Sequence, residues 1–147
     1  MKLVFVGVLS LLAVLVSSAA KADPLRDTCE LMSYIALGDI QGARQYWDGL
    51  VAHWDPAQRE SGTASIFSAL QNQRLSGLSV FRILQLEGVA EEYLAVSGFP
   101  EGGRIYFRIF FEKWGDELRL VNIRYQPNFE EISNPAFAQQ PEPVSCG

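Results

Sequence analysis

The chain has 147 residues, with 17 acidic residues against 12 basic ones and a formal net charge of −5 at pH 7. An acidic chain without a basic cluster lacks the electrostatic footprint for binding nucleic acids or anionic membranes, so the composition excludes both as partners. Its length suits one domain that is large enough to bury a hydrophobic core.

The N-terminal segment, residues 1–22, is predicted to be a secretory signal peptide. Lys2 supplies the positive charge, residues 3–16 form an almost unbroken apolar run, and Ala20-Lys21-Ala22 fits the A-x-A cleavage pattern. The apolar run is short for a membrane span, which needs about 20 residues, although a retained membrane anchor is the alternative. We therefore expect a periplasmic or secreted protein that has left the membrane once the signal is cleaved.

Two cysteines, Cys29 and Cys146, lie near the two ends of the mature chain. In an exported protein they most simply form one disulfide bond; two free thiols or an intermolecular bond are the alternatives. The bridge would hold the proline-rich tail, residues 134–147, against the first helix of a single domain that spans residues 23–133. In the chain-entropy description, closing such a long loop stabilises the fold by about 4–5 kcal/mol.

Two helices are predicted at the start of the domain. Asp23 can cap the first helix, and Pro24 suits its first position. Gly38 can end this helix. Asp39 can then cap a second helix over residues 40–51.

A third helix is predicted after a break at His53-Trp54-Asp55-Pro56. Asp55 can cap a short helical piece that starts at Pro56. Ser61-Gly62 is expected to interrupt this piece, so that the third helix covers residues 63–75.

The second half of the chain changes from helical to extended periodicity. Strands are predicted over residues 79–86 and 91–97, a glycine-rich loop over 97–103, and a long hairpin over 104–125 that turns at Gly115-Asp116. Helices followed by an antiparallel meander define an α+β fold. Three helices are then available to pack on one face of a sheet of about four strands, and the tail is expected to be irregular and outside the core.

The two-residue loop at Gly115-Asp116 sets the register of the hairpin and therefore its two faces. It places Glu112 opposite Arg119, a pair of opposite charge. One face is then mostly apolar, packs against the helices, and carries Asn122 and Arg124 at its far end. The other face is mixed and is a candidate interface with a second copy of the chain or with another exported protein, through Tyr106, Phe110, Val121, Ile123 and Tyr125. Coverage of this face by the tail or by the preceding strands is the alternative.

Aromatic and polar side chains at the boundary between helices and sheet predict a ligand site. An apolar cavity with a few polar groups is the usual form of a small-molecule site. The residues expected to line it are Trp47, His53, Trp54, Tyr93, Asn122 and Arg124, with Tyr46 beside them. The alternative is that the tryptophans belong to the core and that Arg124 only pairs with a carboxylate.

No motif identifies a catalytic centre. His53 is the only histidine, so a multi-histidine metal site is excluded, and we expect neither a metal nor another cofactor. His53 and Asp55 could form an acid–base pair in a cleft. However, Asp55 is better explained as a helix cap, and His53 then becomes a loop residue with a structural hydrogen bond.

The segment Ala36-Leu37-Gly38-Asp39-Ile40-Gln41-Gly42-Ala43 resembles the helix–turn–helix opening of the nuclear transport factor 2-like (SnoaL-like) superfamily. The order of three helices, meander and long terminal hairpin over residues 24–125 is similar to that superfamily as well. The resemblance implies a cystatin-like cone, in which helices close one side of a strongly curved sheet. The superfamily includes isomerases, dehydratases and ligand-binding domains, and its enzymes use Asp/His or Tyr/Asp pairs that face into the cone. No such pair can be placed in the cone from matching positions, so no catalytic residue is carried over.

The sequence therefore favours an exported binding or protein-interaction domain without catalytic activity. Its ligand would be a small apolar molecule held in the cone, and its partner a second copy or another exported protein. A small isomerase or lyase that uses His53 or a buried carboxylate is the alternative. A third interpretation is an accessory or inhibitory protein that docks on another exported protein through the mixed sheet face.

Overall fold

The computed structural model describes residues 22–71 and 73–147. Along the chain these residues form three helices, a four-stranded meander, a short helix and a fifth strand. The predicted signal peptide lies outside the described residues, apart from Ala22. Within the two described ranges, each helix is too short or too polar to cross a bilayer.

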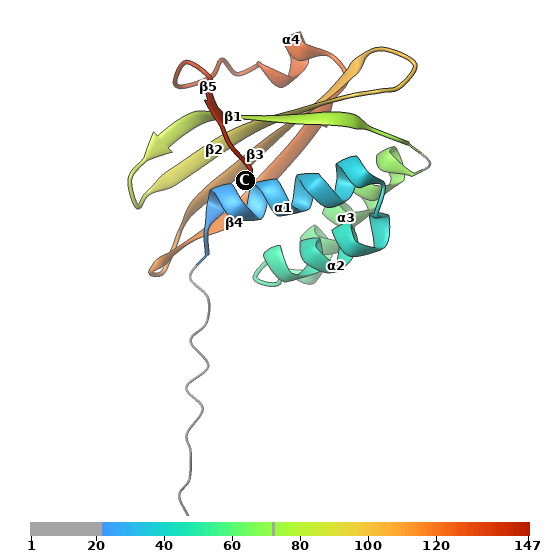
Figure 1. Ribbon diagram of the computed structural model, residues 1–147. Coiled ribbons are helices and arrows are strands. Elements are labelled where there is room, and N and C mark those ends of the chain that lie inside the picture. The colour runs from blue at the N-terminus through green and yellow to red at the C-terminus, as the bar shows by residue number, and fades with distance from the viewer. Residues whose placement is uncertain (1–21, 72) are drawn as a thin grey trace, which may run out of the picture.

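Three helices pack on one face of the sheet (Figure 1): α1 (Pro24–Leu37), α2 (Ile40–Leu50) and α3 (Pro56–Leu70). Each begins at an aspartate whose side chain accepts a backbone N–H, and the three caps are Asp23, Asp39 and Asp55. Such a cap satisfies an N–H that has no partner within the helix and contributes about 1 kcal/mol. The predicted starts of the first two helices are thereby confirmed.

α3 is one continuous helix, so the predicted interruption at Ser61-Gly62 is wrong. Gly62 instead allows α3 to approach two indoles closely. A Cβ atom at this position would lie 3.1 Å from Cζ3 of Trp54 and 3.4 Å from Cζ2 of Trp47. The glycine is therefore a packing residue within the helix and not a helix breaker.

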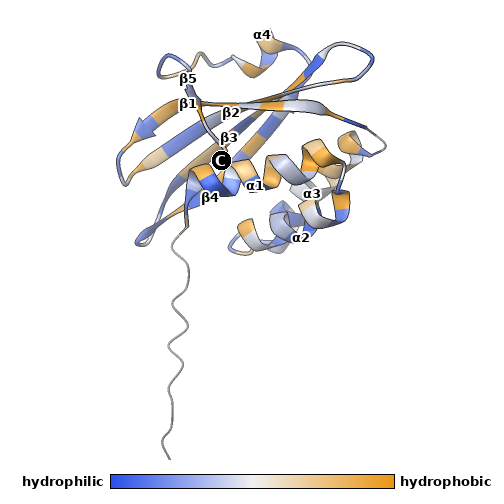
Figure 2. Ribbon diagram, in the orientation of Figure 1, coloured by the Kyte–Doolittle hydropathy of each residue, from blue (hydrophilic) through white to orange (hydrophobic). Residues whose placement is uncertain are grey.

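The sheet is antiparallel and open, with strand order β4-β3-β2-β1-β5. Its strands are β1 (Ser76–Leu86), β2 (Ala90–Gly98), β3 (Arg104–Trp114), β4 (Glu117–Gln126) and β5 (Glu142–Val144). The first four strands form the predicted meander, and the helices on this curved sheet confirm the α+β fold. Hydrophobic and hydrophilic residues are interspersed along the strands (Figure 2), as in a sheet whose two faces differ.

The hairpin of β3 and β4 has the predicted register at its turn but not beyond it. Glu112 lies opposite Arg119, as expected, whereas a bulge leaves Val121 without a partner because Leu120 faces Phe111 and Asn122 faces Phe110. One extra residue in a strand moves every side chain after it to the opposite face of the sheet.

Because of the bulge, the predicted faces of β4 beyond Leu120 are wrong. Ile123 lies opposite Ile109, and Tyr125 lies opposite Phe107, so both belong to the helix-facing side. Arg124 shares the outer side with Arg108, and Asn122 is on the outer side as well. The predicted interface set is therefore not one surface.

The main core fills the space between the three helices and the sheet. Aromatic rings from both layers occupy it, and fully burying a side chain of this size contributes about 1.5–3 kcal/mol. The fully buried aromatic residues are Trp47, Phe67, Tyr93, Phe107 and Phe111.

A second, smaller core lies on the opposite face of the sheet, beneath α4 (Phe129–Ile132) and the start of the tail (Figure 1). Ile83, Leu94 and Ile132 are buried there, and Phe137 packs against them. The tail, predicted to be outside the core, contributes no buried residue, but its half-buried Phe137 packs against this smaller core. On this face, Phe129 of α4 packs against Tyr106.

Two arginines hold the tail on this face. Arg108 forms a buried, two-pronged ion pair with Glu92, with Nε 2.5 Å from Oε1 and Nη2 3.0 Å from Oε2. Its Nη1 also donates to the carbonyl oxygen of Pro135 at 2.5 Å. Arg124 donates to the carbonyl oxygens of Glu131 and Asn134 at 3.1 and 3.0 Å.

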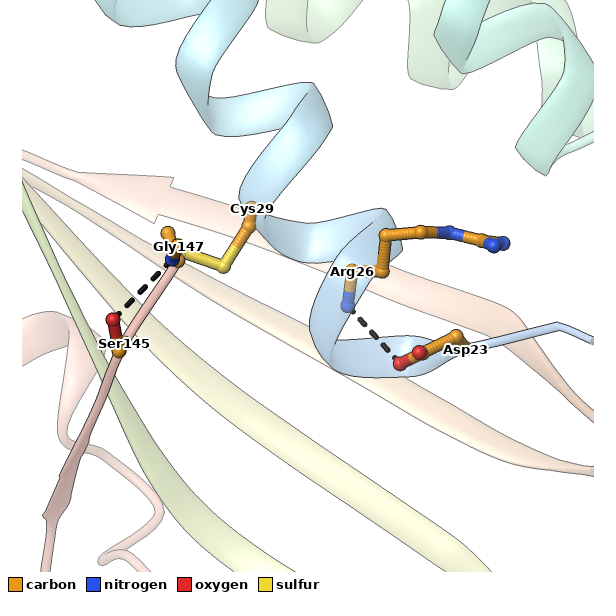
Figure 3. The surroundings of a disulfide bond; sticks show 6 residues. Asp23, Arg26, Cys29, Ser145 and Gly147 are labelled. Carbon is orange, nitrogen blue, oxygen red and sulfur yellow. Dashed lines mark hydrogen bonds between the residues drawn. A yellow bond between two sulfur atoms is a disulfide. The ribbon is translucent and has the colours of Figure 1, made fainter.

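The end of the tail returns to the helical layer. β5 pairs with β1, where Val144 faces Val80, and the predicted disulfide between Cys29 and Cys146 is present (Figure 3). It joins residues that are 117 positions apart. The C-terminal segment is therefore fixed to β1 by strand pairing and to α1 by a covalent bond.

Candidate functional site

Two of the six predicted ligand-binding residues are core residues. Trp47 is fully buried, donates its indole N–H to Oγ1 of Thr63 at 2.8 Å and packs edge-on against Phe67. Tyr93 is 1% exposed, lies edge-on to Phe111 and donates its hydroxyl to Glu91. Burial raises the pKa of Tyr93, and the hydrogen bond to Glu91 adds to this effect. These side chains fill the space where an apolar ligand was expected.

Arg124, another predicted ligand-binding residue, lies on the face of the sheet opposite the helices. The bulge at Val121 turns Arg124 to the outer face, where it binds the backbone of the tail. Its role in the structure is to position the tail.

The other three predicted residues do come together. His53, Trp54 and Asn122 line an open groove with a volume of about 890 Å³, which we call the aromatic groove. The groove lies between the first turns of α3 and the edge strand β4. The remaining lining residues are Asp55, Ala57, Gln58, Ser61, Trp114 and Val121.

Trp54 is rigidly placed in this groove. Its indole N–H donates to the carbonyl oxygen of Leu120 at 2.8 Å, which joins the loop after α2 to β4. Its ring lies edge-on to Trp47, with the ring centroids 5.5 Å apart, and Gly62 packs against its six-membered ring. A half-buried indole with a satisfied N–H presents a preformed aromatic surface.

Trp114 was missed as a site residue because it stands beside the hairpin turn, where the sequence indicated only a strand end. Its side chain is 57% exposed, an unusual state for a tryptophan. Its ring centroid lies 5.8 Å from that of His53, so the imidazole stands between the two indoles of the groove. A tryptophan directly before the turn at Gly115-Asp116 was the signal that the sequence offered.

The surroundings of His53 favour its neutral imidazole form. Burial lowers its pKa, and the charge of Arg119 acts in the same direction, while backbone groups of Leu120 and Leu50 partly oppose them. Its Nε2 atom is buried without a hydrogen-bond partner among the described residues.

The predicted acid–base pair of His53 and Asp55 is not formed. Oδ1 of Asp55 accepts the backbone N–H groups of Ala57 and Gln58, each at 3.0 Å. Asp55 is therefore a helix cap, the preferred sequence interpretation.

A smaller cavity of about 300 Å³ lies on the other side of His53 and contains a buried carboxylate. Asp27 is 6% exposed and accepts the hydroxyl of Tyr46 at 2.9 Å and Nη2 of Arg26 at 3.1 Å. Burial raises the pKa of Tyr46, and hydrogen bonds to Glu30 and Asp27 raise it further. A carboxylate and a phenol in contact can relay a proton, and sequence reasoning did not single out Asp27.

Within the described residues, no group of three or more His, Cys, Asp or Glu side chains is arranged to hold a metal ion. Comparison with protein-family models, with curated proteins and with solved structures gives no match. The function is therefore inferred from the geometry of the sites.

Proposed function

We propose that the protein is an exported binding domain without catalytic activity, and that it binds an extended segment of another protein in the aromatic groove. The observation that carries this proposal is the position of the groove. It follows the free edge of β4, the first strand in the sheet order, and two indoles and an imidazole line it.

The edge of β4 offers backbone groups to such a segment. An edge strand can accept a further strand, whose main-chain hydrogen bonds supply affinity while pockets for alternate side chains supply specificity. The carbonyl of Leu120 is already occupied by Trp54, but the bulge leaves Val121 without a partner in β3. Beyond Leu120, Val121 and Asn122 of β4 line the groove.

The side chains of the groove fit a peptide with an apolar or aromatic anchor. Trp114 is exposed, and exposed aromatic groups beside a polar rim are characteristic of interaction sites. Gln58, Ser61 and Asn122 supply amide and hydroxyl groups along the walls. Trp54 forms a fixed surface against which the anchor side chain would pack.

Export is supported by two features. The first is the charge, apolar run and A-x-A pattern of residues 1–22. The second is the disulfide between Cys29 and Cys146, since such bonds persist in oxidising compartments.

Selection from a phage-displayed library of random peptides on the oxidised mature protein tests this function. We expect selected peptides to share an aromatic or apolar anchor and to bind wild type in a saturable manner. The variant Trp114→Ala should weaken that binding by roughly tenfold or more, as removal of an interface anchor does.

The matched control is Phe129→Ala, which removes another exposed aromatic side chain, 48% exposed, on the outer face of the sheet. It should leave peptide affinity unchanged. Selected peptides that bind Trp114→Ala as tightly as wild type, or that lose affinity in Phe129→Ala instead, would refute the proposed site.

A small isomerase or lyase is the second candidate, and the contact between Asp27 and Tyr46 is the observation that favours it. The resemblance to the nuclear transport factor 2-like superfamily adds support, because enzymes of that superfamily use Tyr/Asp pairs. The cavity beside Asp27 also reaches His53. A proton taken from a carbon next to a carbonyl group would pass to the carboxylate.

Deuterium incorporation into 2-tetralone in heavy water, followed by NMR, tests this second candidate. Enzyme activity predicts exchange above the buffer rate for wild type and loss of that excess in Asp27→Asn and Tyr46→Phe. Exchange at the buffer rate in wild type, or an equal rate in Asp27→Asn, would eliminate proton abstraction by this pair.

A further inference from the structure

We propose that the outer face of the sheet holds a second binding site, for a single apolar molecule with an anionic head group. The site is a depression of about 510 Å³ over the start of β1, the end of β2 and the start of β3, which we call the outer-face groove. It shares no lining residue with the aromatic groove. The proposal is therefore independent of the proposed peptide site.

The floor of the outer-face groove is apolar. Phe81 lies opposite Leu94, and Val96 lies opposite Tyr106, so the four side chains share one face of the sheet. All four belong to or pack against the smaller core on this face. Such a floor binds hydrocarbon or aromatic surface, at about 25 cal/mol for each Å² removed from water.

The walls of the groove come from α4 and from the tail. Phe129 of α4 stands on one side, with its ring centroid 5.4 Å from that of Tyr106. Pro141 stands elsewhere on the rim, directly before β5, whose end is fixed by the disulfide. The walls are therefore in place before a ligand arrives, which lowers the entropic cost of binding.

Arg104 supplies a positive charge at the outer-face groove. It is the one charged residue that lines the groove, its side chain is exposed, and it forms no ion pair with any described residue. A guanidinium group binds a carboxylate through two parallel hydrogen bonds. An apolar floor beside one free guanidinium fits a carboxylate that carries a hydrocarbon chain.

The size of the groove agrees with such a ligand. Sites for small molecules usually enclose about 300–1,000 Å³, and the groove falls within this range. A free, monomeric fatty acid is a better match than an anionic bilayer, because a chain with a formal net charge of −5 is repelled by a negatively charged surface.

Isothermal titration calorimetry of the oxidised mature protein with monomeric laurate tests the proposal. We expect saturable binding to wild type. The variant Arg104→Gln should weaken it by roughly tenfold or more, as loss of a charge-assisted contact implies. Arg74→Gln, which changes an exposed arginine outside the groove, is the matched control and should bind as wild type does.

Two more titrations distinguish this site from nonspecific adsorption of an alkyl chain and from binding in the aromatic groove. Dodecyltrimethylammonium has the same chain with a cationic head group and should not bind, and Trp114→Ala should bind laurate as wild type does. Absence of saturable binding, equal affinity in Arg104→Gln, or binding only to phosphatidylglycerol vesicles would overturn the proposal. Loss of laurate binding in Trp114→Ala would do so as well, because it would assign the ligand to the aromatic groove.

Discussion

Trp54 donates its indole N–H to the carbonyl oxygen of Leu120 at 2.8 Å, across 66 positions in the sequence. This hydrogen bond connects the loop between α2 and α3 to the edge strand of the sheet. It holds the ring of Trp54, which lines the aromatic groove, against β4. We therefore expect the shape of the aromatic groove to depend on this hydrogen bond.

We expect Trp54→Phe to lower the free energy of unfolding by about 1–3 kcal/mol, because the carbonyl of Leu120 loses its partner in a part-buried site. Urea denaturation of wild type and variant measures this difference. Trp114→Phe, which changes an exposed indole, is the control and should stay within about 0.5 kcal/mol of wild type. Equal stability of Trp54→Phe and wild type would show that the hydrogen bond contributes nothing.

Gly62→Ala is expected to destabilise the protein even though alanine is the better helix former. The gain in helix propensity is about 1 kcal/mol. The added Cβ would lie 3.1 Å from the ring of Trp54, which is held by its hydrogen bond and cannot move away. Overpacking of this kind costs about 1–3 kcal/mol.

The matched control is Gly49→Ala in α2, where an added Cβ meets no atom within 4 Å. This variant should be more stable than wild type by about 0.5–1 kcal/mol. Thermal or urea unfolding of both variants should therefore show changes of opposite sign. A stabilised Gly62→Ala would contradict the packing role of this glycine.

Arg108→Met is expected to be strongly destabilising. It leaves the carboxylate of Glu92, in a residue that is 9% exposed, without its partner and releases the carbonyl of Pro135. Breaking a buried ion pair on one side costs about 3–5 kcal/mol.

The double variant Arg108→Met/Glu92→Leu removes both charges and should recover a large part of the loss, because no isolated charge remains buried. Urea denaturation of the two variants and wild type measures both effects. A double variant that is less stable than Arg108→Met would argue against an unpaired charge as the cause.

Removal of the disulfide by Cys29→Ala/Cys146→Ala should lower the free energy of unfolding by up to about 4–5 kcal/mol in the chain-entropy description. We also expect faster hydrogen exchange at the backbone amides of β5, since its covalent anchor is lost. Reduction of the wild-type protein should reproduce both changes. Alkylation of two thiols in the unreduced native protein would rule out the bond.

The stability of the protein should depend on pH through His53. Its pKa is lowered in the folded chain by burial, from an ordinary value of 6.5. Below that value the unfolded chain takes up the proton more readily than the folded chain, so His53 reduces stability as the pH falls below 6.5. His53→Gln should therefore lose stability less steeply than wild type in acid.

Because His53 is the only histidine of the chain, its ring resonances in a proton NMR titration give its pKa directly. The titration should have its midpoint below 6.5 in the folded protein. A midpoint at or above that value would contradict the burial of the imidazole in the groove wall.

The helix starts could be predicted because their causes are local. Asp23, Asp39 and Asp55 each stand directly before a helical segment, and a cap needs only its own side chain and the next few N–H groups. The hairpin turn could also be predicted from Gly115. Its φ in the structure is 65°, a backbone conformation that suits glycine. The α+β fold follows from the order of these elements.

The faces of β4 could not be predicted, because the bulge at Val121 has no local signature. A straight strand and a bulged strand fit the same alternation, and one extra residue moved Arg124 to the face opposite the helices. Arg124 was consequently assigned to a pocket when it holds the tail.

The smaller core on the outer face of the sheet was not predicted, for a different reason. Phe137 stands in the tail, whose composition is typical of an irregular segment, and Ile132 stands just before it. Their packing depends on β1 and β2, which are distant in sequence. Only the folded sheet brings these partners together. The same holds for the groove walls at Phe129 and Pro141.

The bond between Cys29 and Cys146 also changes how the protein responds to proteases. Nearly the whole folded domain lies within a single covalent ring. One cut in any loop between the two cysteines opens the ring but releases no fragment, and the pieces stay held by the sheet and by the sulfur bridge. In a protease-rich environment, a nicked molecule would therefore keep both grooves until a second cut is made.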